Sequence, residues 1–448
     1  MTGGHILLKK SPPLTGTVEV NGAKNAVLVI MASLILTDGL STLENVPNNA
    51  DVRQMIKLLE ELGATVNFAV ASKVMKVDTA DVCKFEIKPE IMNKFRASIL
   101  VMGPLLARFG KAKIALPGGD LIGRRPINYH LEGFKKFGVV TERHDPYVNA
   151  SLKSFHDLPL YARIILEYPS VGATENLMMF ACLAKGETVI INAAIEPEVL
   201  DLIDTLKAMG ADIQIQPAAT IVIKGVGKLH PVTHKIIPDR LEVGSLLLAA
   251  AITGGQITVS NARADHLDIF LEKLCQMGHE VTSPLDKGSC AKPYGITLRA
   301  TQHPQAVDIK TGPYPAFPTD LQPLTMAALS VAEGVSLVEE TVYENRMIHT
   351  KELSKMGAQI TVEGCKAIVR GVEALYGCEV IASDVRASCA LVLGGLVAFG
   401  QTKMTGIGHW QRGYDKLEEK LVAMGADIIT IDDQIIILDG LRTAQKLL

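Results

Sequence analysis

The sequence predicts an α/β protein (α+β in some classifications) of two domains, each built from three repeats around three buried helices. Three observations predict this fold. A short phrase recurs six times, an apolar helix-length segment precedes each copy, and short β-branched segments follow it. In addition, a chain of 448 residues is long for one hydrophobic core, which favours two domains.

The recurring phrase ends in an apolar residue, a glycine and one further, mostly small residue. The separation between successive glycines is 68 to 79 residues, which is longer than the roughly 20–50 residues of solenoid repeats. Each copy is therefore expected to be a small unit with its own sheet. The six copies are LEELGA (Leu59–Ala64), FKKFGV (Phe134–Val139), LKAMGA (Leu206–Ala211), LCQMGH (Leu274–His279), LSKMGA (Leu353–Ala358) and LVAMGA (Leu421–Ala426).

Each unit is expected to begin with an almost wholly apolar helix, which must be buried on all sides. A glycine is expected to cap this helix, and a strand, an amphipathic helix ending in the phrase, and one or two further strands follow. The expected buried helices are 26–36, 97–107, 177–184, 246–252, 324–331 and 387–398, and the expected capping glycines are Gly39, Gly110, Gly186, Gly254, Gly334 and Gly400.

Six units divide naturally into two domains of three, with residues 23–237 in one and residues 1–22 plus 238–448 in the other. The residues alone leave open which domain takes the leading segment 6–20. The N-termini of buried helices carry unpaired N–H groups and partial positive charge. If these ends face a cleft between the domains, that cleft attracts anions.

The composition indicates a globular protein without signals for several partner classes. The net charge of −3 gives no support to a nucleic-acid or membrane-surface partner, and the longest apolar segments fall short of a span of about 18–20 residues. Seven cysteines without a C-x-x-C pair predict small core residues in a reducing cytoplasm. Metal-binding spacings, a P-loop and a dinucleotide fingerprint are absent, so we expect no metal and no cofactor.

The segment LPGGDLIGRRPINYH (Leu116–His130) has the character of a lid. Its Pro-Gly-Gly approach is flexible, Asp120 stands at the tip, and the pair Arg124 and Arg125 precedes Pro126. Proline suits the first position of a helix, so we expect a helix to start there. A carboxylate followed by guanidinium groups on such a loop indicates a lid over an anionic substrate.

Further charged residues fall where buried helices begin. Lys24 and Asn25 indicate either a phosphate contact or a solvated lysine beside a helix cap, and the sequence leaves both open. Five arginines occupy helix starts or loops leading to them; each alone is typical of a surface, whereas together they could grip phosphate and carboxylate. They are Arg96, Arg125, Arg346, Arg386 and Arg412.

The phrase PAFPTD (Pro315–Asp320) leads into another buried helix. Thr319 or Asp320 could serve as its N-cap. Asp320 could also accept a proton from a substrate hydroxyl among these cations, and the two roles do not exclude each other.

The chain resembles the enolpyruvyltransferase superfamily over essentially its whole length, and within it the family that acts on UDP-N-acetylglucosamine. The resemblance implies two inside-out α/β barrel domains of three repeats, with the active site in the cleft between them. The phrases that carry it are NGAKNA (Asn21–Ala26), LPGGDLIGRRP (Leu116–Pro126), SVGATEN (Ser170–Asn176), NAAIEPEV (Asn192–Val199), IPDRLEVG (Ile237–Gly244), AFPTDLQ (Ala316–Gln322), YENR (Tyr343–Arg346), DVRA (Asp384–Ala387) and RGYD (Arg412–Asp415).

The resemblance also implies a reaction and the residues that perform it. Phosphoenolpyruvate gives its enolpyruvyl group to the 3′-hydroxyl of UDP-N-acetylglucosamine by addition and elimination, phosphate leaves, and the product is the first committed precursor of peptidoglycan. The residues carried over as catalytic are Asp120, Lys24, Asp320 and Arg412. Lys24, Asn25, Arg125, Arg346, Arg386 and Arg412 would surround phosphoenolpyruvate, and Arg96, Arg125, Pro126, Ile127, Asn128, Tyr129, Tyr168, Pro169, Ser170, Val171 and Val342 would hold the UDP-sugar.

The sequence departs from the family pattern at two places. Most members carry cysteine where this chain has Asp120, and many have lysine where it has Tyr168-Pro169. By resemblance to the minority that carries aspartate, Asp120 is the general acid. Because a carboxyl group of reference pKa about 3.9 is mostly ionised at neutral pH, our hypothesis is that the closed loop raises the pKa of Asp120. A carboxylate is a weak nucleophile toward epoxides, so we also expect fosfomycin resistance.

Three alternatives accompany this interpretation. The sister enzymes that act on shikimate 3-phosphate share the fold and the donor, but their GNAGT-like and PGSKS-like phrases are missing here. A non-catalytic UDP-sugar-binding paralogue is favoured only by Asp120. A repeat scaffold for protein partners would leave the arginines unexplained.

Overall fold

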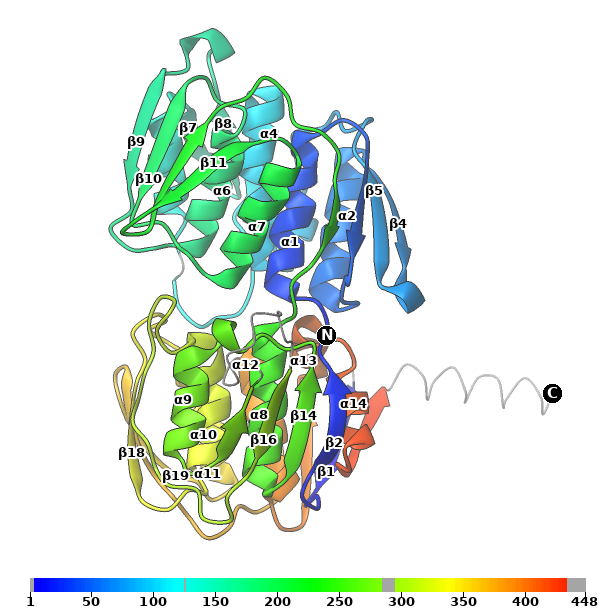
Figure 1. The fold of residues 1–448 in the computed structure, drawn as a ribbon, viewed down its shortest axis with the longest axis vertical. Helices are drawn as coiled ribbons and strands as arrows, with labels where there is room; N and C mark the ends of the chain where they lie inside the picture. The colour runs from blue at the N-terminus through cyan, green and yellow to red at the C-terminus, as the bar shows by residue number, and fades with distance from the viewer. Residues whose placement is uncertain (1–3, 125, 284–294, 433–448) are drawn as a thin grey trace, which may run out of the picture. The chain divides into compact units, whose positions relative to one another are not determined.

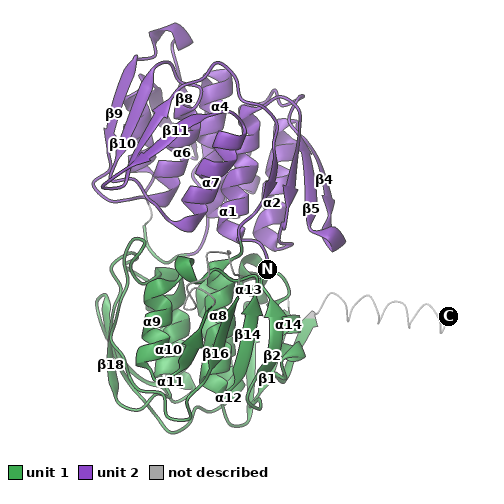
Figure 2. Ribbon diagram, viewed as in Figure 1, with its two compact units in different colours: residues 1–20, 121–124, 238–448 green, residues 21–120, 125–237 purple. Residues whose placement is uncertain are grey.

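The computed structural model describes residues 4–124, 126–283 and 295–432. The chain divides into two compact units (Figure 2). Unit 1 comprises Met1–Val20, Leu121–Arg124 and Pro238–Leu448, and unit 2 comprises Asn21–Asp120 and Arg125–Ile237. The division differs from the sequence expectation at two places. Residues 21–22 belong to unit 2, and residues 121–124 of the predicted lid belong to unit 1 and not to the unit that contains the rest of the lid.

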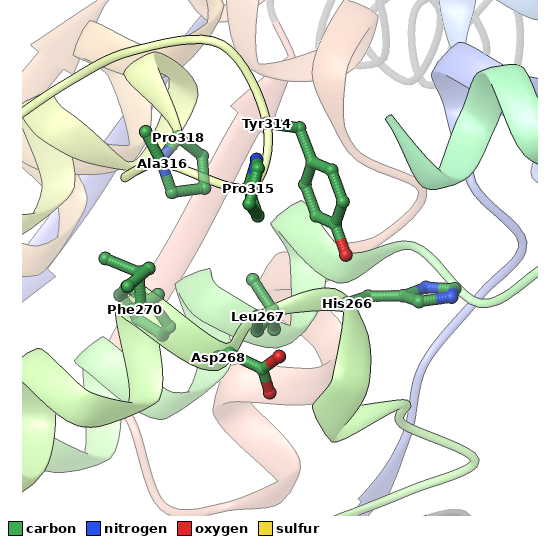
Figure 3. A pocket seen from close by; sticks show the side chains of 9 residues that line it. His266, Leu267, Asp268, Phe270, Tyr314, Pro315, Ala316 and Pro318 are labelled. Carbon is green, nitrogen blue, oxygen red and sulfur yellow. The ribbon is translucent and has the colours of Figure 1, made fainter. Parts of the chain in front are cut away.

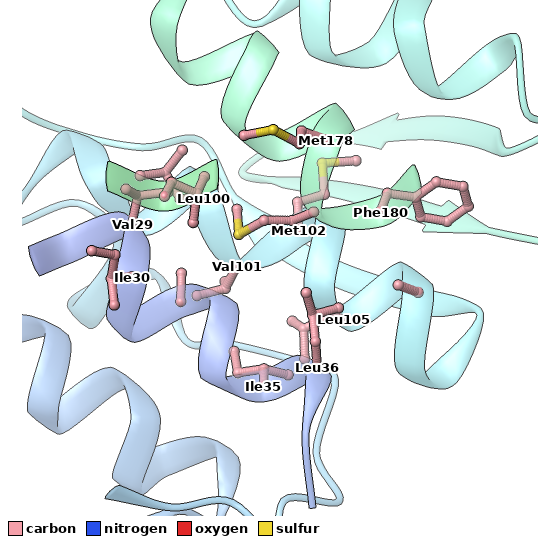
Figure 4. Close-up of a cluster of buried hydrophobic side chains, with 14 of the residues drawn as sticks. Val29, Ile30, Ile35, Leu36, Leu100, Val101, Met102, Leu105, Met178 and Phe180 are labelled. Atoms are coloured by element: carbon pink, nitrogen blue, oxygen red, sulfur yellow. The ribbon is translucent and has the colours of Figure 1, made fainter. Parts of the chain in front are cut away.

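Three apolar helical segments form the centre of unit 2. They are α1, a 3₁₀ helix continuing into α4, and α6; α1 and α6 both contact the 3₁₀ helix, and α4 contacts α6. Side chains such as Val29, Val101 and Met178 point toward one another from the three segments (Figure 4). The α-helices of unit 2 are α1 (Lys24–Ser33), α2 (Ala50–Leu62), α3 (Pro89–Met92), α4 (Met102–Phe109), α5 (Asn128–Lys135), α6 (Val171–Ala181) and α7 (Pro197–Ala208), and the 3₁₀ helix before α4 is Arg96–Val101.

Unit 1 repeats this plan around three helices that contact one another, α8, α10 and α12. Amphipathic helices pack outside the central ones in both units, for example α2 on α1, α5 on α6 and α11 on α12. The α-helices of unit 1 are α8 (Arg240–Thr253), α9 (Asp268–Gln276), α10 (Gln322–Leu329), α11 (His349–Lys355), α12 (Val385–Val397), α13 (Ile407–Gly413) and α14 (Leu417–Ala423).

Several central helices begin earlier than their apolar runs. Helix α6 starts at Val171 instead of residue 177, and α8 starts at Arg240 instead of residue 246. Ser170 and Asp239 cap these two helices by accepting backbone N–H groups of the first turn. The early residues of these helices include buried polar side chains, such as Glu175 and Asn176 in α6 and Glu242 in α8, which is why hydrophobicity alone placed the helix starts too late.

The described strands form six sheets, three in each unit, with one common pattern (Figure 1). A first strand pairs in parallel with a second, and the second and third, and third and fourth, pair antiparallel. In the β6 sheet a single parallel bridge between Glu86 and Lys113 replaces the first strand. In this order, unit 2 has β13 (Thr233–Lys235), β3 (Leu40–Glu44), β5 (Val74–Asp78) and β4 (Thr65–Ala69); β6 (Lys111–Ala115), β8 (Tyr147–Ser151) and β7 (Val140–His144); and β9 (Tyr161–Ile165), β10 (Glu187–Ile191), β12 (Thr220–Lys224) and β11 (Asp212–Gln216).

The leading segment, which the sequence left open, joins unit 1. Strand β1 takes the third place of one sheet and β2 takes the first place of another. In the same order as above, unit 1 has β2 (Thr15–Glu19), β14 (Gln256–Ser260), β16 (Ile296–Arg299) and β15 (Glu280–Thr282); β17 (Ile309–Lys310), β18 (Val335–Glu339), β20 (Lys366–Arg370) and β19 (Gln359–Glu363); and β21 (Glu379–Ile381), β22 (Gln401–Thr405), β1 (Gly4–Lys9) and β23 (Ile428–Asp432).

The recurring phrase forms the same helix end six times. In the first copy the N–H of Gly63 donates to the carbonyl of Glu60, and the N–H of Ala64 donates to the carbonyl of Leu59. The other five copies repeat both bonds, and all six glycines have positive φ. This is the Schellman motif, in which the carbonyl of the first residue of the phrase accepts the N–H of the last residue and the glycine adopts the left-handed conformation.

The prediction that a glycine caps each central helix is right for two of the six. Gly110 caps α4 and Gly254 caps α8. The other four glycines have positive φ but lie beyond the cap position, in the turn that leads to the next strand. They are Gly39, Gly186, Gly334 and Gly400.

Two other sequence expectations concern burial. Cys182 and Cys389 are buried as expected, but Cys83, Cys275 and Cys365 are exposed, so the interpretation of the cysteines as core residues is wrong for those three. They occupy loops or outer helix faces, where no core packs against them; Cys290 lies outside the described residues. Within the described ranges, no helix combines the length and the apolar character needed to cross a bilayer.

Candidate active site

A charged cluster in unit 1 is centred on Asp320. One carboxylate oxygen accepts from Nη2 of Arg346 at 2.9 Å, and the other accepts from Nε and Nη2 of Arg386 at 3.0 and 2.9 Å. The guanidinium groups are buried, with 4% and 3% of the residue surface exposed, whereas the Asp320 side chain keeps 26% of its surface. The structure therefore brings together three residues that are far apart in the chain, with only the carboxylate open to solvent.

The capping interpretation of Thr319 and Asp320 is wrong. The 3₁₀ helix Thr319–Leu321 and the following α10 have no side-chain cap. Thr319 donates its hydroxyl to Glu340 instead, at 2.9 Å. Asp384 does cap its helix, α12, by accepting the N–H groups of Arg386 and Ala387.

Both buried arginines remain charged, which has an electrostatic cause. Burial by itself lowers the pKa of Arg346, but the charges of Asp320 and Asp384 outweigh it and raise that pKa. The same balance raises the pKa of Arg386 further, with Asp320 again the main opposing charge. Two cations thus stay fixed beside one carboxylate.

Arg346 has hydrogen-bonding capacity that the described protein atoms do not use. Its Nε and Nη1 are buried and reach no acceptor among the described residues. Buried donors without partners are rare in native proteins and call for an explanation. Since guanidinium groups bind carboxylate and phosphate through two donors, these nitrogens fit an anionic ligand.

Tyr414 is a member of this cluster that the sequence analysis did not assign to a site. Its hydroxyl accepts from Nη1 of Arg386 at 3.1 Å and lies 3.1 Å from the hydroxyl of Ser245 on α8. Tyr414 lies between α13 and α14. Its proximity to Arg412 in the RGYD phrase is the signal that could have indicated a site role.

Arg412 differs from the other arginines in its place in the fold. The sequence placed it at a helix start or in a loop leading to one, whereas it lies in the last turn of α13, half-buried. The expected single amphipathic helix of the last repeat is two short helices, because the chain breaks at Tyr414 and turns through Lys416 at positive φ. Arg346, by contrast, lies in a turn before α11, and Arg386 is the second residue of α12.

In unit 2, Lys24 is the first residue of α1 and forms an ion pair with Asp51 at 3.3 Å. The side chains keep 12% and 6% of their surface exposed, so this is no solvated surface lysine. Asn25 is exposed and makes no cap hydrogen bond to α1, whose cap residue is Ala23. The cap interpretation is therefore wrong, and a second predicted cation is held at a central helix start.

Two further predicted segments of unit 2 flank α6. Arg96 begins the 3₁₀ helix before α4. Burial, and to a smaller extent the charge of Arg96, lowers the pKa of His130 to about 3. The neutral imidazole of His130 lies 3.0 Å from the amide of Asn176 on α6. Tyr168 and Pro169 precede the cap residue Ser170 and the half-buried first helical residue Val171.

The predicted lid has an anchor in each unit. Gly118 approaches Asn93 so closely that a Cβ would lie 1.9 Å from the Asn93 carbonyl oxygen. At the other end, the Arg124 N–H donates to Glu344 at 2.8 Å, and the Asn345 N–H donates to the Ile122 carbonyl at 3.0 Å. Asp120 lies half-buried between these anchors.

The helix after the lid starts later than predicted. Helix α5 begins at Asn128 with Ile127 as its cap residue, so Pro126 lies outside it. The backbone of Ile127, with φ −99° and ψ 14°, is not yet helical. Pro126 and Asn128 are exposed, Ile127 and Tyr129 are half-buried, and Arg125 lies outside the described residues.

Val342, the remaining predicted contact, is half-buried in the segment between β18 and Arg346. Its N–H donates to Glu340 at 2.8 Å. The predicted residues thus fall into a unit 1 group (Asp320, Val342, Arg346, Arg386 and Arg412) and a unit 2 group (Lys24, Asn25, Arg96, Asp120, Pro126, Ile127, Asn128, Tyr129, Tyr168, Pro169, Ser170 and Val171).

A small pocket elsewhere in unit 1 lacks the character of this cluster (Figure 3). It is lined by residues such as His266, Asp268, Phe270 and Tyr314. Burial lowers the pKa of His266 to about 4, so this imidazole is neutral at pH 7. Its lining contains no lysine or arginine, so it offers no cationic side chain to an anionic substrate. No group of His, Cys, Asp and Glu among the described residues is arranged to hold a metal ion.

Comparison with known proteins adds independent information. The family profile of EPSP synthase (3-phosphoshikimate 1-carboxyvinyltransferase) matches residues 8–421. The UDP-N-acetylglucosamine 1-carboxyvinyltransferase 1 of Caldanaerobacter subterraneus subsp. tengcongensis is 46% identical over 422 residues, which cover 94% of this chain and 98% of that protein. The UDP-N-acetylglucosamine 1-carboxyvinyltransferase of Geobacter metallireducens is 44% identical over 423 residues, with 94% and 98% coverage.

Solved structures support the fold. The enolpyruvyl transferase NikO from Streptomyces tendae matches with a TM-score of 0.85 at 23% identity, covering 96% of this chain and 99% of that one. EPSP synthase from Acinetobacter baumannii matches with a TM-score of 0.73 at 16% identity, covering 95% and 99%. At these identities the likeness concerns the fold, which confirms the predicted fold class. On the sequence relationships, the chain belongs to the family of UDP-N-acetylglucosamine 1-carboxyvinyltransferases.

Proposed function

We propose that this protein transfers the enolpyruvyl group of phosphoenolpyruvate to the 3′-hydroxyl of UDP-N-acetylglucosamine and releases phosphate. The observation that carries the proposal is the Asp320 cluster, in which a partly open carboxylate lies between two buried guanidinium groups and Arg346 keeps two unused donors. The names of relatives that are 46% and 44% identical support this choice of acceptor.

The reaction needs a base, an acid and a place for negative charge. In the addition step the 3′-oxygen bonds to C2 of phosphoenolpyruvate, its proton goes to the base, and C3 takes a proton from the acid. In the elimination step C3 loses a proton and the bond between C2 and the phosphate oxygen breaks, which restores the double bond. The net change is the transfer of one enolpyruvyl group and the release of one phosphate.

Asp320 is the proposed base. Two guanidinium groups keep it ionised, so it can accept a proton, but they also weaken it as a base. Binding of an anionic donor to Arg346 and Arg386 would partly neutralise these cations and increase the proton affinity of Asp320. The base would thus become effective when the donor is bound.

Asp120 is the proposed acid, and the lid that carries it would close over the substrates. Its two anchors, Gly118 on unit 2 and Arg124 on unit 1, support this role because they fix the ends of a short segment around Asp120. Closure would remove water from the carboxyl group, which favours its protonated form.

The remaining contacts are proposals carried by the resemblance. The residues that would surround phosphoenolpyruvate are Arg346, Arg386, Arg412, Lys24, Asn25 and Arg125. Arg96, residues 125–129 and 168–171, and Val342 would hold the UDP-sugar. The ion pair of Lys24 with Asp51 supports the presence of a fixed cation at the start of α1.

The test is the release of inorganic phosphate when the protein is mixed with phosphoenolpyruvate and UDP-N-acetylglucosamine. Each substrate alone should release none. Shikimate 3-phosphate in place of the UDP-sugar tests the sister activity, and we expect no turnover with it. A protein that binds the UDP-sugar but releases no phosphate would be a non-catalytic paralogue, contrary to the proposal.

The cellular setting follows from this activity and is part of the proposal. The product would enter peptidoglycan synthesis, in the cytoplasm and without a cofactor. The relatives' names indicate small-molecule substrates. The expectation that no nucleic acid and no membrane is a partner stays a prediction.

A further inference from the structure

We infer that Glu340 is a positioning residue that joins the segment carrying Asp320 to the segment carrying Val342, and that it thereby tunes affinity for the acceptor substrate. This inference rests on the proposed function. Glu340 directly follows β18, and 2% of its surface is exposed. Neither the sequence analysis nor the resemblance assigned it a role.

The carboxylate of Glu340 accepts four hydrogen bonds from three separate segments. Oε1 accepts from the Val342 N–H at 2.8 Å, the Tyr343 N–H at 3.1 Å and the Thr311 hydroxyl at 2.9 Å. Oε2 accepts from the Thr319 hydroxyl at 2.9 Å. Thr319 is the residue before Asp320, so one buried group holds both the proposed base segment and the proposed sugar-contacting segment.

A second set of bonds fixes the same junction. The Thr341 N–H donates to the Thr311 hydroxyl oxygen at 2.9 Å, and the Thr341 hydroxyl donates to the Thr311 carbonyl at 2.7 Å. The backbone N–H of Glu340 donates to the Cys365 carbonyl at 2.8 Å. The start of the segment that leads to Arg346 is therefore held on both sides, and the Glu340 carboxylate extends this support to the Thr319 side chain.

A carboxylate suits this position because all four partners act as donors and it offers acceptors only. Hydrogen bonds to an ionised acceptor are roughly twice as strong as neutral ones. In Glu340→Gln, Oε1 can still accept its three bonds, but an amide NH₂ would face Thr319, whose hydroxyl would have to turn and accept. Glu340→Ala would remove all four bonds and leave buried donors unpaired.

A change at Glu340 is expected to alter the positions of the segments around the site more than the charges within it. Asp320 also has its own ion pairs to Arg346 and Arg386, so the cations stay in place when Glu340 is changed. What is lost is the fixed spacing between the base segment and the backbone at Val342. Because Val342 is a proposed contact of the UDP-sugar and none of phosphoenolpyruvate, the loss should fall on the acceptor.

The experiment measures kcat and both KM values by phosphate release for four variants and one control variant. We expect Glu340→Ala to raise KM for UDP-N-acetylglucosamine by about tenfold or more, since small misplacements are costly. KM for phosphoenolpyruvate should change less than about threefold, because the guanidinium groups keep their own anchors. Glu340→Gln and Thr319→Val should each raise the acceptor KM about two- to fivefold, in line with the loss of one strong hydrogen bond.

The double variant Thr319→Val/Glu340→Gln should be no worse than the larger single effect, because both changes break the same link. The matched control is Glu339→Gln. It removes the charge of a half-buried side chain that forms an ion pair with Lys310 at 3.5 Å, and it should leave both KM values unchanged. Melting temperatures of all variants show whether each one is folded.

Three outcomes contradict the inference while wild-type protein is active. In the first, Glu340→Gln and Thr319→Val are both folded and leave the KM for the acceptor unchanged. In the second, their effects add fully in the double variant. In the third, both KM values rise together, in proportion to a fall in melting temperature. Wild-type protein that releases no phosphate instead contradicts the proposed function, and the inference falls with it.

Discussion

Asp320 allows two different sequence interpretations, and the structure contradicts one of them, the helix cap. A threonine and an aspartate after two prolines are typical of a helix cap. Two buried arginines from distant segments hold the carboxylate instead.

The first prediction at this scale concerns Asp120. We expect Asp120→Asn to lower kcat about 10²- to 10⁴-fold, because an amide cannot donate the proton that general acid catalysis requires. Phosphate release under saturating substrates measures it. The control is Asp38→Asn, which breaks an exposed ion pair with Lys228 and should leave kcat unchanged. Near-normal turnover in Asp120→Asn would rule out the acid role.

The second prediction concerns alkylation. A carboxylate attacks epoxides far less readily than a thiolate does. Wild-type protein should therefore keep its activity during incubation with fosfomycin, and Asp120→Cys should lose activity over time and gain the mass of one adduct. Intact-mass spectrometry reports the adduct. Equal inactivation of both proteins would contradict the argument.

At the scale of the element, the six helix ends of the recurring phrase have one physical basis. The glycine supplies a positive φ, which costs other residues roughly 1–2 kcal/mol. Gly138 is the cleanest place to measure this, since its φ is +81° and a Cβ would meet no atom within 4 Å. Any cost of substitution there comes from the backbone and not from a clash.

We therefore expect Gly138→Ala to lower the free energy of unfolding by about 1 kcal/mol, and Gly138→Asn to lower it less because asparagine tolerates the left-handed region. Urea unfolding measures both. Gly227→Ala is the matched control, because a Cβ there also meets nothing within 4 Å and its φ is not positive. It should be neutral or stabilising by up to about 1 kcal/mol. Equal costs at both positions would refute the φ argument.

The start of each central helix shows the limit of local patterns. Asp384, Asp239 and Ser170 cap their helices, whereas Asp320 does not. All four are small polar residues before an apolar run, so the sequence cannot separate them. The difference arises because Arg346 and Arg386 compete for the Asp320 carboxylate, and ion pairs with two buried cations outweigh one helix cap.

At the scale of the whole molecule, four buried histidines predict how stability depends on pH. Burial lowers the pKa of His130 to about 3 and that of His266, His279 and His349 to about 4. The unfolded chain, with a histidine pKa near 6.5, therefore binds protons that the folded protein rejects.

This difference in proton binding determines how the free energy of unfolding changes with pH. Stability is fully present above about pH 6.5 and is lost as the pH falls toward about 4, by up to about 1.4 kcal/mol per pH unit for each histidine. The raised pKa values of Glu175 and Asp268 oppose this trend, but they are two groups against four histidines. Urea unfolding between about pH 7.5 and 4.5, a range of about three pH units, measures how the free energy of unfolding depends on pH.

His279→Asn provides the test of cause. The asparagine oxygen can still accept the Thr301 N–H that now donates to His279 at 3.2 Å, but it cannot be protonated. The slope should become smaller by about one histidine's share. A variant with the wild-type slope would show that His279 is not among the groups responsible.

Much of this protein is determined by the sequence alone. The six repeats, the central helices, the Schellman ends and the fold class follow from periodicity and from glycine at positive φ, which are properties of neighbouring residues. The importance of Asp320, Arg346 and Arg386 also follows from phrases that can be read locally and from the resemblance they carry.

Other features were decided only by tertiary structure. The pairing of β1 with β22 and β23, the attachment of residues 121–124 to Glu344 and Asn345, and the bonds of Glu340 to Thr319 and Val342 all join parts of the chain that no local pattern connects. The physical reason is that hydrogen bonds and ion pairs between distant segments depend on which partners packing brings within about 3 Å. Burial then decides how strongly each pair matters.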